Sequence, residues 1–274
     1  MTVQTTGATT FGLVGFGAVG RTAARMIGEG AAGSATLLGV LVAHPERYAE
    51  DALAMGVPYL ARTEDLIALR PRVVLEAGGH AAFRQHVPAL LAGGVDVISI
   101  SVGALADPEL LETTCAASVR GGGQLRVPSG AIAALDAISA AAVGRLDRVL
   151  HTVRKPPTTL LDGEEGLAVI RSGVERVLYE GPAREATQLF PANVNVIAAV
   201  SLAGIGMDRT EARVIADPAV VHNTHDLEVD GEFGRLRVRI ENVPSAENPK
   251  TGRIVALSLV RSLRALNEPI VVGG

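Results

Sequence analysis

Three glycines recur in the spacing Gly-x-Gly-x-x-Gly immediately after the first strongly apolar run of the chain. They fall between a predicted strand at residues 11–14 and a predicted helix at 21–27, where a phosphate-binding turn is expected. The first glycine permits a tight turn, the second lets the backbone approach a ligand, and the third lets helix and strand pack closely. The start of the helix presents free N–H groups and a partial positive charge to phosphate. The residues that we predict to bind the pyrophosphate of a nicotinamide dinucleotide are Gly15, Phe16, Gly17, Ala18, Val19 and Gly20. The alternative is a glycine-rich turn without a ligand.

The first half of the chain alternates short apolar runs with helical patterns. Such alternation indicates a parallel sheet whose strands are joined by crossover helices. The predicted strands are residues 11–14, 37–42, 73–77, 95–100 and 125–128, and the predicted helices between them include 81–92 and 108–118.

The pattern changes after about residue 131. An alanine-rich helix at 131–143 precedes several strand-like runs with few helices between them, which indicate a second domain with an antiparallel sheet. A helix at 249–266, with Asn248 as its N-cap and Pro249 in its first turn, closes the chain, and we expect it to pack on the first domain. The predicted strands are 149–153, 174–179, 212–216 and a hairpin at 224–240 that turns near Asp230 and Gly231. We therefore predict an α/β protein with an N-terminal Rossmann domain at 1–130 and 246–274, and an α+β domain at 131–245.

Composition restricts the partners and the location. The 274 residues carry a formal net charge of −4, so the charge gives no reason to expect nucleic acid or a membrane as partner. The longest apolar stretch, 196–207, is too short to span a bilayer and is predicted to be a core helix. The first residues lack the features of a signal peptide, so we expect a cytoplasmic protein. Cys115 is the only cysteine, which excludes an internal disulfide, and we expect it to be buried in a helix.

The end of the second predicted strand bears on the choice of cofactor. An NAD site usually places an acidic residue there to bind the ribose hydroxyls. This chain has Ala43, His44 and Pro45, followed by Glu46 and Arg47. Because Arg47 and His44 could contact a 2′-phosphate, the sequence leaves both NAD and NADP open.

Seven further segments carry glycine and polar residues in a fixed order. They are Glu76-Ala77-Gly78-Gly79-His80, Ser99-Ile100-Ser101-Val102-Gly103-Ala104-Leu105, Pro128-Ser129-Gly130-Ala131-Ile132, Arg154-Lys155-Pro156, Phe190-Pro191-Ala192-Asn193-Val194-Asn195-Val196, Asn223-Thr224-His225 and Asn248-Pro249-Lys250-Thr251. Their order and spacing resemble the L-aspartate dehydrogenase family over nearly the whole chain. Two features depart from the family pattern: Gly252 stands where serine is usual, and no tryptophan follows the Lys155-Pro156 step.

The resemblance implies NAD- or NADP-dependent oxidation of L-aspartate to iminoaspartate, which hydrolyses to oxaloacetate and ammonia or supplies NAD biosynthesis. It also implies that the second domain forms the substrate site and the contact of a homodimer. By motif match, Ala131 and Asn195 are contacts of the nicotinamide cofactor, and His225 is the active-site histidine. Further candidate cofactor contacts, near the ends of predicted strands, are Gly78, His80, Ser101 and Val102.

The residues themselves also favour His225. A histidine suits proton transfer from the substrate amine because it titrates near neutral pH. In the predicted hairpin His225 shares the inward face with Leu227 and Val229, while the acidic residues of the other face can pair with arginines of the returning strand. The alternative is a hydrogen-bonded core histidine. Of the other histidines, His222 is expected to face solvent, His80 to border the cofactor or only the turn, and His44, His86 and His151 to be surface or packing residues.

A substrate with two carboxylates needs hydrogen-bond donors. The candidates are Asn223, Lys155, Lys250, Thr251, Asn193 and Asn195. The alternatives are solvated surface lysines and, for the asparagines 193 and 195, capping of the following helix. We predict no metal, because no histidine pair has helical ligand spacing and His222 and His225 point to opposite faces of a strand.

Two rival functions remain at this point. One is an NAD(P)-dependent oxidoreductase of the same build that acts on another amino or imino acid. The other is a protein that senses the dinucleotide without catalysing a reaction.

Overall fold

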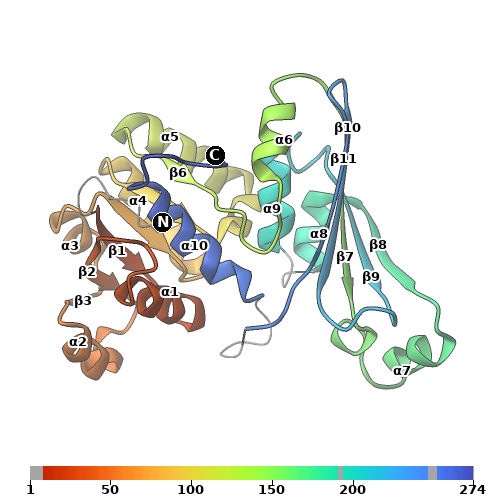
Figure 1. Cartoon of the computed structure of the whole chain (residues 1–274), viewed down its shortest axis with the longest axis horizontal. Helices are drawn as coiled ribbons and strands as arrows, with labels where there is room; N and C mark the ends of the chain where they lie inside the picture. The colour runs from red at the N-terminus through yellow and green to blue at the C-terminus, as the bar shows by residue number, and fades with distance from the viewer. Residues whose placement is uncertain (1–8, 191–193, 246–251, 274) are drawn as a thin grey trace. The chain divides into compact units, whose positions relative to one another are not determined.

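The computed structural model of the chain describes residues 9–190, 194–245 and 252–273 (Figure 1). Its contacts divide the chain into two compact units, called unit 1 and unit 2 below. Unit 1 comprises residues 1–130 and 255–274, and unit 2 comprises residues 131–254. No helix in the described ranges is both long and apolar enough to cross a membrane.

The centre of unit 1 is a six-stranded sheet in the order β3-β2-β1-β4-β5-β6. All neighbouring strands run parallel, which confirms the prediction from the strand–helix alternation. The strand order reverses between β1 and β4, the kind of position at which open α/β sheets bind ligands. The strands are β1 (Thr9–Val14), β2 (Ala35–Leu41), β3 (Tyr59–Leu60), β4 (Val73–Glu76), β5 (Asp96–Ser99) and β6 (Leu125–Arg126).

One hydrophobic core joins the first and last parts of unit 1. Phe11 of β1 and Ile27 of α1 belong to the same buried cluster as Leu259 and Leu263 of α10. The predicted return of the last helix to the first domain is therefore confirmed. The helical segments of unit 1 are α1 (Ala18–Gly28), η1 (Pro45–Tyr48), α2 (Ala49–Met55), α3 (Thr63–Ala68), α4 (His80–Ala92), η2 (Val102–Ala106), α5 (Pro108–Gly121) and α10 (Ile254–Ala265).

The start of the last helix differs from the prediction. The helix begins at Ile254 rather than in the segment predicted from residue 249. Gly252 forms a β-bridge with Pro244, and this extended pairing is incompatible with helix at that point. Asn248 and Pro249, the predicted first residues of the helix, lie outside the described residues.

The helix that carries Cys115 was predicted correctly, but the burial of the cysteine was not. The buried side chains of α5 are Leu110, Thr114 and Ala117, which share one face at helical spacing. Cys115 lies off that face and is exposed. The sequence of this weakly amphipathic helix does not reveal which of its faces is buried.

Unit 2 is built on a five-stranded sheet in the order β11-β10-β7-β9-β8. The prediction of an antiparallel sheet is wrong for one pair, because β7 and β9 run parallel. The chain between them contains several helices and one strand, and a connection of that length allows two strands to run in the same direction. The strands are β7 (Leu146–Lys155), β8 (Arg176–Pro182), β9 (Glu211–Ala216), β10 (Thr224–Gly231) and β11 (Gly234–Glu241), so the hairpin turns at residues 232 and 233.

Helices pack on one face of this sheet. Ile138 of α6 and Val200 of α9 form a buried cluster with Val149 of β7 and with Leu227 and Val229 of β10. Helix α9 covers residues 196–203 of the apolar stretch 196–207 that was predicted to be a core helix, and most of the helix's side chains are buried. The helical segments of unit 2 are α6 (Leu135–Ala141), η3 (Pro157–Thr159), α7 (Gly163–Ser172), α8 (Ala183–Leu189) and α9 (Val194–Ala203).

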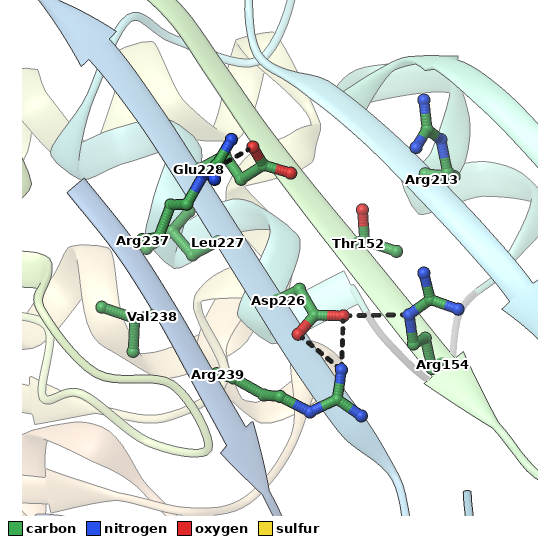
Figure 2. Close-up of a pocket in the computed structure, with 9 residues that line it drawn as sticks. All are labelled: Thr152, Arg154, Arg213, Asp226, Leu227, Glu228, Arg237, Val238 and Arg239. Carbon is green, nitrogen blue, oxygen red and sulfur yellow. Dashed lines mark hydrogen bonds and ion pairs between the residues drawn. The ribbon is translucent and has the colours of Figure 1, made fainter. Parts of the chain in front are cut away.

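The opposite face of the β10–β11 hairpin carries the acid–arginine pairs that strand alternation predicts. The directly opposite pairs are Asp226–Arg239, Glu228–Arg237 and Asp230–Arg235, and each forms an ion pair. Figure 2 shows the first two, with Asp226 also accepting from Arg154 of the neighbouring strand β7. On this face each acidic side chain is therefore paired with an arginine. The apolar side chains of the other face and His225 point toward the core.

Candidate functional site

The glycine turn has the geometry that its sequence predicts. Gly15 leaves β1 with a positive φ of +86°, and a Cβ on it would overlap the backbone of Gly78. A Cβ on Gly20 would overlap the carbonyl oxygen of Gly15, so this glycine lets α1 begin directly against the turn. Gly17 is the N-cap of α1, and nothing lies within 4 Å of where its Cβ would be. This open space at a helix N-terminus is what close approach of a pyrophosphate requires.

The remaining residues of the turn anchor it. Phe16 is buried, with its ring against Tyr48 and Tyr59 at centroid distances of 5.9 and 5.2 Å. Arg21 lies over the Phe16 ring at 4.5 Å, and its Nε donates to the Phe16 carbonyl at 3.1 Å. Phe16 is therefore a support of the turn rather than a side chain that faces a ligand, and only its backbone is available for phosphate. Ala18 and Val19 form the first turn of α1.

A buried carboxylate organises the neighbouring loop. Glu76 is the last residue of β4 and is fully buried. It accepts hydrogen bonds from the Gly78 amide at 2.7 Å, from the Ser101 hydroxyl at 2.9 Å and from the Ser99 hydroxyl. The Ser101 hydroxyl in turn accepts from the Gly79 amide at 3.1 Å. Glu76 thus joins the ends of β4 and β5 and holds the backbone that lies against Gly15.

Glu76 begins one of the seven segments, but its sequence position predicted no role for it. The signal was an acidic residue at the end of the apolar run Val73-Val74-Leu75, directly before the two glycines. Burial raises the pKa of the Glu76 carboxyl above its ordinary value, and the hydrogen bonds from Ser99, Ser101 and Gly78 oppose that shift in part.

Replacing Glu76 with leucine is expected to destabilise the fold by about 2–5 kcal/mol, because two buried serine hydroxyls and one amide lose their acceptor. Glutamine keeps an acceptor oxygen and the side-chain length, so E76Q should lose less than half as much. Urea unfolding of the two variants measures the difference in unfolding free energy. Equal stability of E76L and the parent protein would show that the network contributes nothing to the fold.

The other predicted cofactor contacts of unit 1 differ in how deeply their side chains are buried. Val102 is buried as the first residue of η2, so its side chain packs inward. His80 is half-buried as the first residue of α4. His44 is exposed after β2, with Nδ1 3.2 Å from a carboxylate oxygen of Glu46, and Arg47 beside it is exposed. The side chains of His44 and Arg47 therefore both lie outside the core.

The histidine site lies on the inner face of the sheet of unit 2. His225 of β10 is only 1% exposed, which confirms the predicted inward orientation, while His222 is exposed. The Nε2 atom of His225 lies 3.2 Å from the amide nitrogen of Asn223. Its Nδ1 atom lies 3.0 Å from Nε2 of His151 on β7. The centroids of the two imidazole rings are 5.2 Å apart and the ring planes are inclined by only 17°, so the two rings meet edge to edge through this bond.

Burial keeps both imidazoles neutral. It lowers the pKa of His151 to about 4, because the charged form loses its hydration. It also lowers the pKa of His225 well below the ordinary value, and the nearby His151 and Lys155 add to this shift as positive or potentially positive neighbours. His225 is therefore deprotonated at neutral pH and able to accept a proton.

Two of the predicted substrate donors accompany His225. Lys155 ends β7 and is partly buried, and this burial lowers the pKa of its ammonium group. Asn223 precedes β10 and donates toward His225, while its Oδ1 atom is buried and has no hydrogen-bond partner within the described part of the chain. That oxygen can accept a hydrogen bond from a cationic ligand. Lys250, Thr251 and Asn193 lie outside the described residues.

The two predicted nicotinamide contacts also belong to unit 2. Ala131 begins the unit, and its carbonyl oxygen accepts from the Asn242 side chain at 3.0 Å. Asn195 lies in the first turn of α9, where capping of the helix is the alternative role.

Among the described residues, no three histidine, cysteine, aspartate or glutamate side chains gather as a metal site would require.

Comparison with known proteins places the chain in a family. A family model described as the C-terminal part of aspartate dehydrogenase matches residues 136–266, and one described as the NAD-binding domain of homoserine dehydrogenase matches residues 15–128. The L-aspartate dehydrogenase of Methanosarcina acetivorans is 39% identical over 268 residues, which cover 96% of this chain and 98% of the relative. The chain belongs to the L-aspartate dehydrogenase family. The enzyme of that name from Methanosarcina barkeri is 45% identical over 204 residues, covering 73% of this chain and 75% of the relative.

A solved structure also supports the membership of this chain in the L-aspartate dehydrogenase family. The crystal structure of aspartate dehydrogenase from Thermotoga maritima matches with a TM-score of 0.76 at 25% identity, covering 97% of this chain and 99% of that chain. The resemblance inferred from the seven motifs is confirmed. The match of residues 15–128 to NAD-binding domains also agrees with the glycine turn, and a pyridine nucleotide is the cofactor class of this family member.

A hollow of about 460 Å³ lies on the outer face of the unit 2 sheet, away from His225. Arg154, Arg237 and Arg239 line it, and each is paired with a carboxylate (Figure 2). Because these cations already have partners, the hollow offers less to a dicarboxylate than the His225 site does. The sequence predicted His151 to be a surface or packing residue, whereas the structure buries it in contact with His225.

Proposed function

We propose that this protein catalyses NAD- or NADP-dependent oxidative deamination of L-aspartate. The product iminoaspartate then hydrolyses to oxaloacetate and ammonia, or supplies NAD biosynthesis. The observation that carries the proposal is the buried, neutral His225, hydrogen-bonded to Asn223 and close enough to Lys155 for its charge to act on the imidazole. The family relationship supports L-aspartate as the substrate.

The substrate side of the proposal follows from charge. L-Aspartate arrives with an ammonium group and two carboxylates, and the ammonium must lose a proton before a hydride can leave Cα. His225 accepts that proton on Nε2. The unpaired Oδ1 of Asn223 accepts a hydrogen bond from the substrate nitrogen. Lys155 binds one carboxylate, and we assign Lys250 and Thr251 to the other.

The cofactor side rests on the glycine turn. The turn fits a dinucleotide because Gly17 leaves open space at the N-terminus of α1. When bound, the nicotinamide supplies the acceptor for the hydride from Cα of the substrate. The residues that we assign to cofactor binding are Gly15, Phe16, Gly17, Ala18, Val19, Gly20, His44, Gly78, His80, Ser101, Val102, Ala131 and Asn195. We further propose a cytoplasmic homodimer, since the resemblance assigns the dimer contact to the second domain.

Initial rates with purified protein test this function. L-Aspartate with NAD or NADP should give reduced cofactor, and L-glutamate should be slower in kcat/KM by about 10- to 200-fold, as expected for one additional methylene. NAD and NADP remain alternatives; if His44 and Arg47 contact a 2′-phosphate, H44A and R47A should raise the KM for NADP but leave the KM for NAD unchanged. Turnover of another amino acid without turnover of L-aspartate would refute the proposal. Binding of NAD(P) without turnover of any amino acid would favour a sensor.

A further inference from the structure

Two buried imidazole side chains are in direct contact in unit 2. Such a contact is a hydrogen bond only when one of the two facing nitrogens carries a proton and the other does not. His151 and His225 both lie on the inner face of the unit 2 sheet, from the adjacent strands β7 and β10. Both are at most 1% exposed, and their rings share one hydrogen bond between His151 Nε2 and His225 Nδ1. Only one of these two nitrogens can carry the proton of that bond.

The position of the proton follows from the partner on the other side of His225. The Asn223 amide nitrogen can only donate, so His225 Nε2 accepts and carries no proton. A neutral imidazole has one proton, which must then be on His225 Nδ1 and be donated to His151 Nε2. The proton of His151 is accordingly on its Nδ1, which is buried without a partner in the described part of the chain.

We propose that His151 is a positioning residue that accepts the Nδ1 proton of His225 and thereby keeps His225 Nε2 unprotonated, so that this nitrogen can accept the substrate's proton in place of the hydrogen bond from Asn223. The inference rests on the base role proposed for His225. After proton transfer, His225 is an imidazolium that still donates from Nδ1, and His151 stays neutral. The arrangement resembles the way an orienting side chain fixes the tautomer of a catalytic histidine, here with a neutral acceptor.

The surroundings favour a neutral acceptor. The groups whose charge acts on His225 are His151 and Lys155, both on β7, and the residue opposite on β11 is the apolar Ile240. A carboxylate in the place of His151 would raise the pKa of His225 by stabilising its charged form. His151 fixes the tautomer without adding negative charge.

Nitrogen NMR of protein labelled at histidine reads the tautomer directly, with and without bound NAD. The signals of residues 151 and 225 are assigned from their loss in H151Q and H225Q. We expect His225 to carry its proton on Nδ1 and to have a bare Nε2. A proton on Nε2 of His225 would overturn the proposal. This result is independent of whether the protein oxidises L-aspartate.

Kinetics of two variants test the consequence. H151L removes the acceptor, so kcat should fall about 10- to 100-fold while the KM values for L-aspartate and cofactor change less than about threefold. H151Q places an amide oxygen near the former Nε2 and should recover most of kcat. An unchanged kcat in H151L, or a loss in H151Q as large as in H151L, would overturn the proposal.

H86L is the matched control. His86 is also buried and bonded to a single side chain, the Thr63 hydroxyl at 2.8 Å, but it lies in unit 1. H86L should leave kcat unchanged, which separates loss of a buried imidazole from loss of the contact with His225. If H151L fails to fold, H151Q and the NMR tautomer decide the matter. A parent enzyme without L-aspartate turnover would instead refute the proposed function.

Discussion

Replacing His225 with glutamine is expected to lower kcat for L-aspartate oxidation by about 10²- to 10⁴-fold, the usual contribution of a positioned general base. Glutamine can still hydrogen-bond to Asn223 and His151, but it cannot accept a proton at neutral pH. Cofactor binding should persist, because the glycine turn belongs to the other unit of the chain. Steady-state kinetics, with NADH affinity from fluorescence titration, measures both quantities.

His222 provides the control for this variant. It precedes β10 by two residues and is exposed, so H222Q changes a histidine of the same segment without reaching the core. Its kcat should equal that of the parent enzyme. If H225Q retains full kcat, His225 is a core histidine, and the proton acceptor must be sought among other residues.

The lowered pKa of His225 predicts how kcat/KM for L-aspartate depends on pH. Because burial lowers the pKa of His225 well below the ordinary histidine value near 6.5, the free enzyme keeps its base unprotonated on the acid side of neutrality. The acid limb of the kcat/KM profile for L-aspartate should therefore lie below pH 6.5 rather than at or above it. Such a profile distinguishes a buried base from a solvated one.

Local patterns predicted the parts of the site that depend on neighbouring residues. The Gly15–Gly20 turn followed from glycine spacing between a strand and a helix, and the inward orientation of His225 followed from strand alternation. Both depend on residues within a few positions of each other. The same locality explains why the three acid–arginine pairs of the hairpin could be predicted.

The contacts that the sequence did not reveal join distant residues. His151 and His225 are 74 positions apart, and their contact depends on the pairing of β7 with β10. Glu76 and Ser101 are joined across the ends of two parallel strands, which no single periodic pattern encodes. The parallel pairing of β7 with β9 was missed for the same reason, since strand direction depends on the whole intervening connection.

Replacing Gly17 with valine is expected to weaken binding of the dinucleotide about 10- to 100-fold while the protein remains folded. Gly17 has φ −79° and ψ −164°, an extended conformation that valine adopts readily, and no protein atom lies within 4 Å of its Cβ position. The valine side chain would instead occupy the space through which the backbone approaches the pyrophosphate. Losing one hydrogen bond to a charged group costs about 1.5–3 kcal/mol, which corresponds to that change in Kd.

Gly28 gives a matched control for G17V, since it is the last residue of the same helix, is exposed and also has open space around its Cβ position. G28V introduces the same side chain at the other end of α1, and its effect on NADH affinity should be negligible. Isothermal titration of NADH, with thermal unfolding of both variants, separates binding from folding. Equal affinity of G17V and G28V would mean that the open space at the N-terminus of α1 is not where the pyrophosphate binds. A loss of NADH affinity in G17V but not in G28V would instead assign the cofactor to the glycine turn. This measurement does not depend on catalysis at His225.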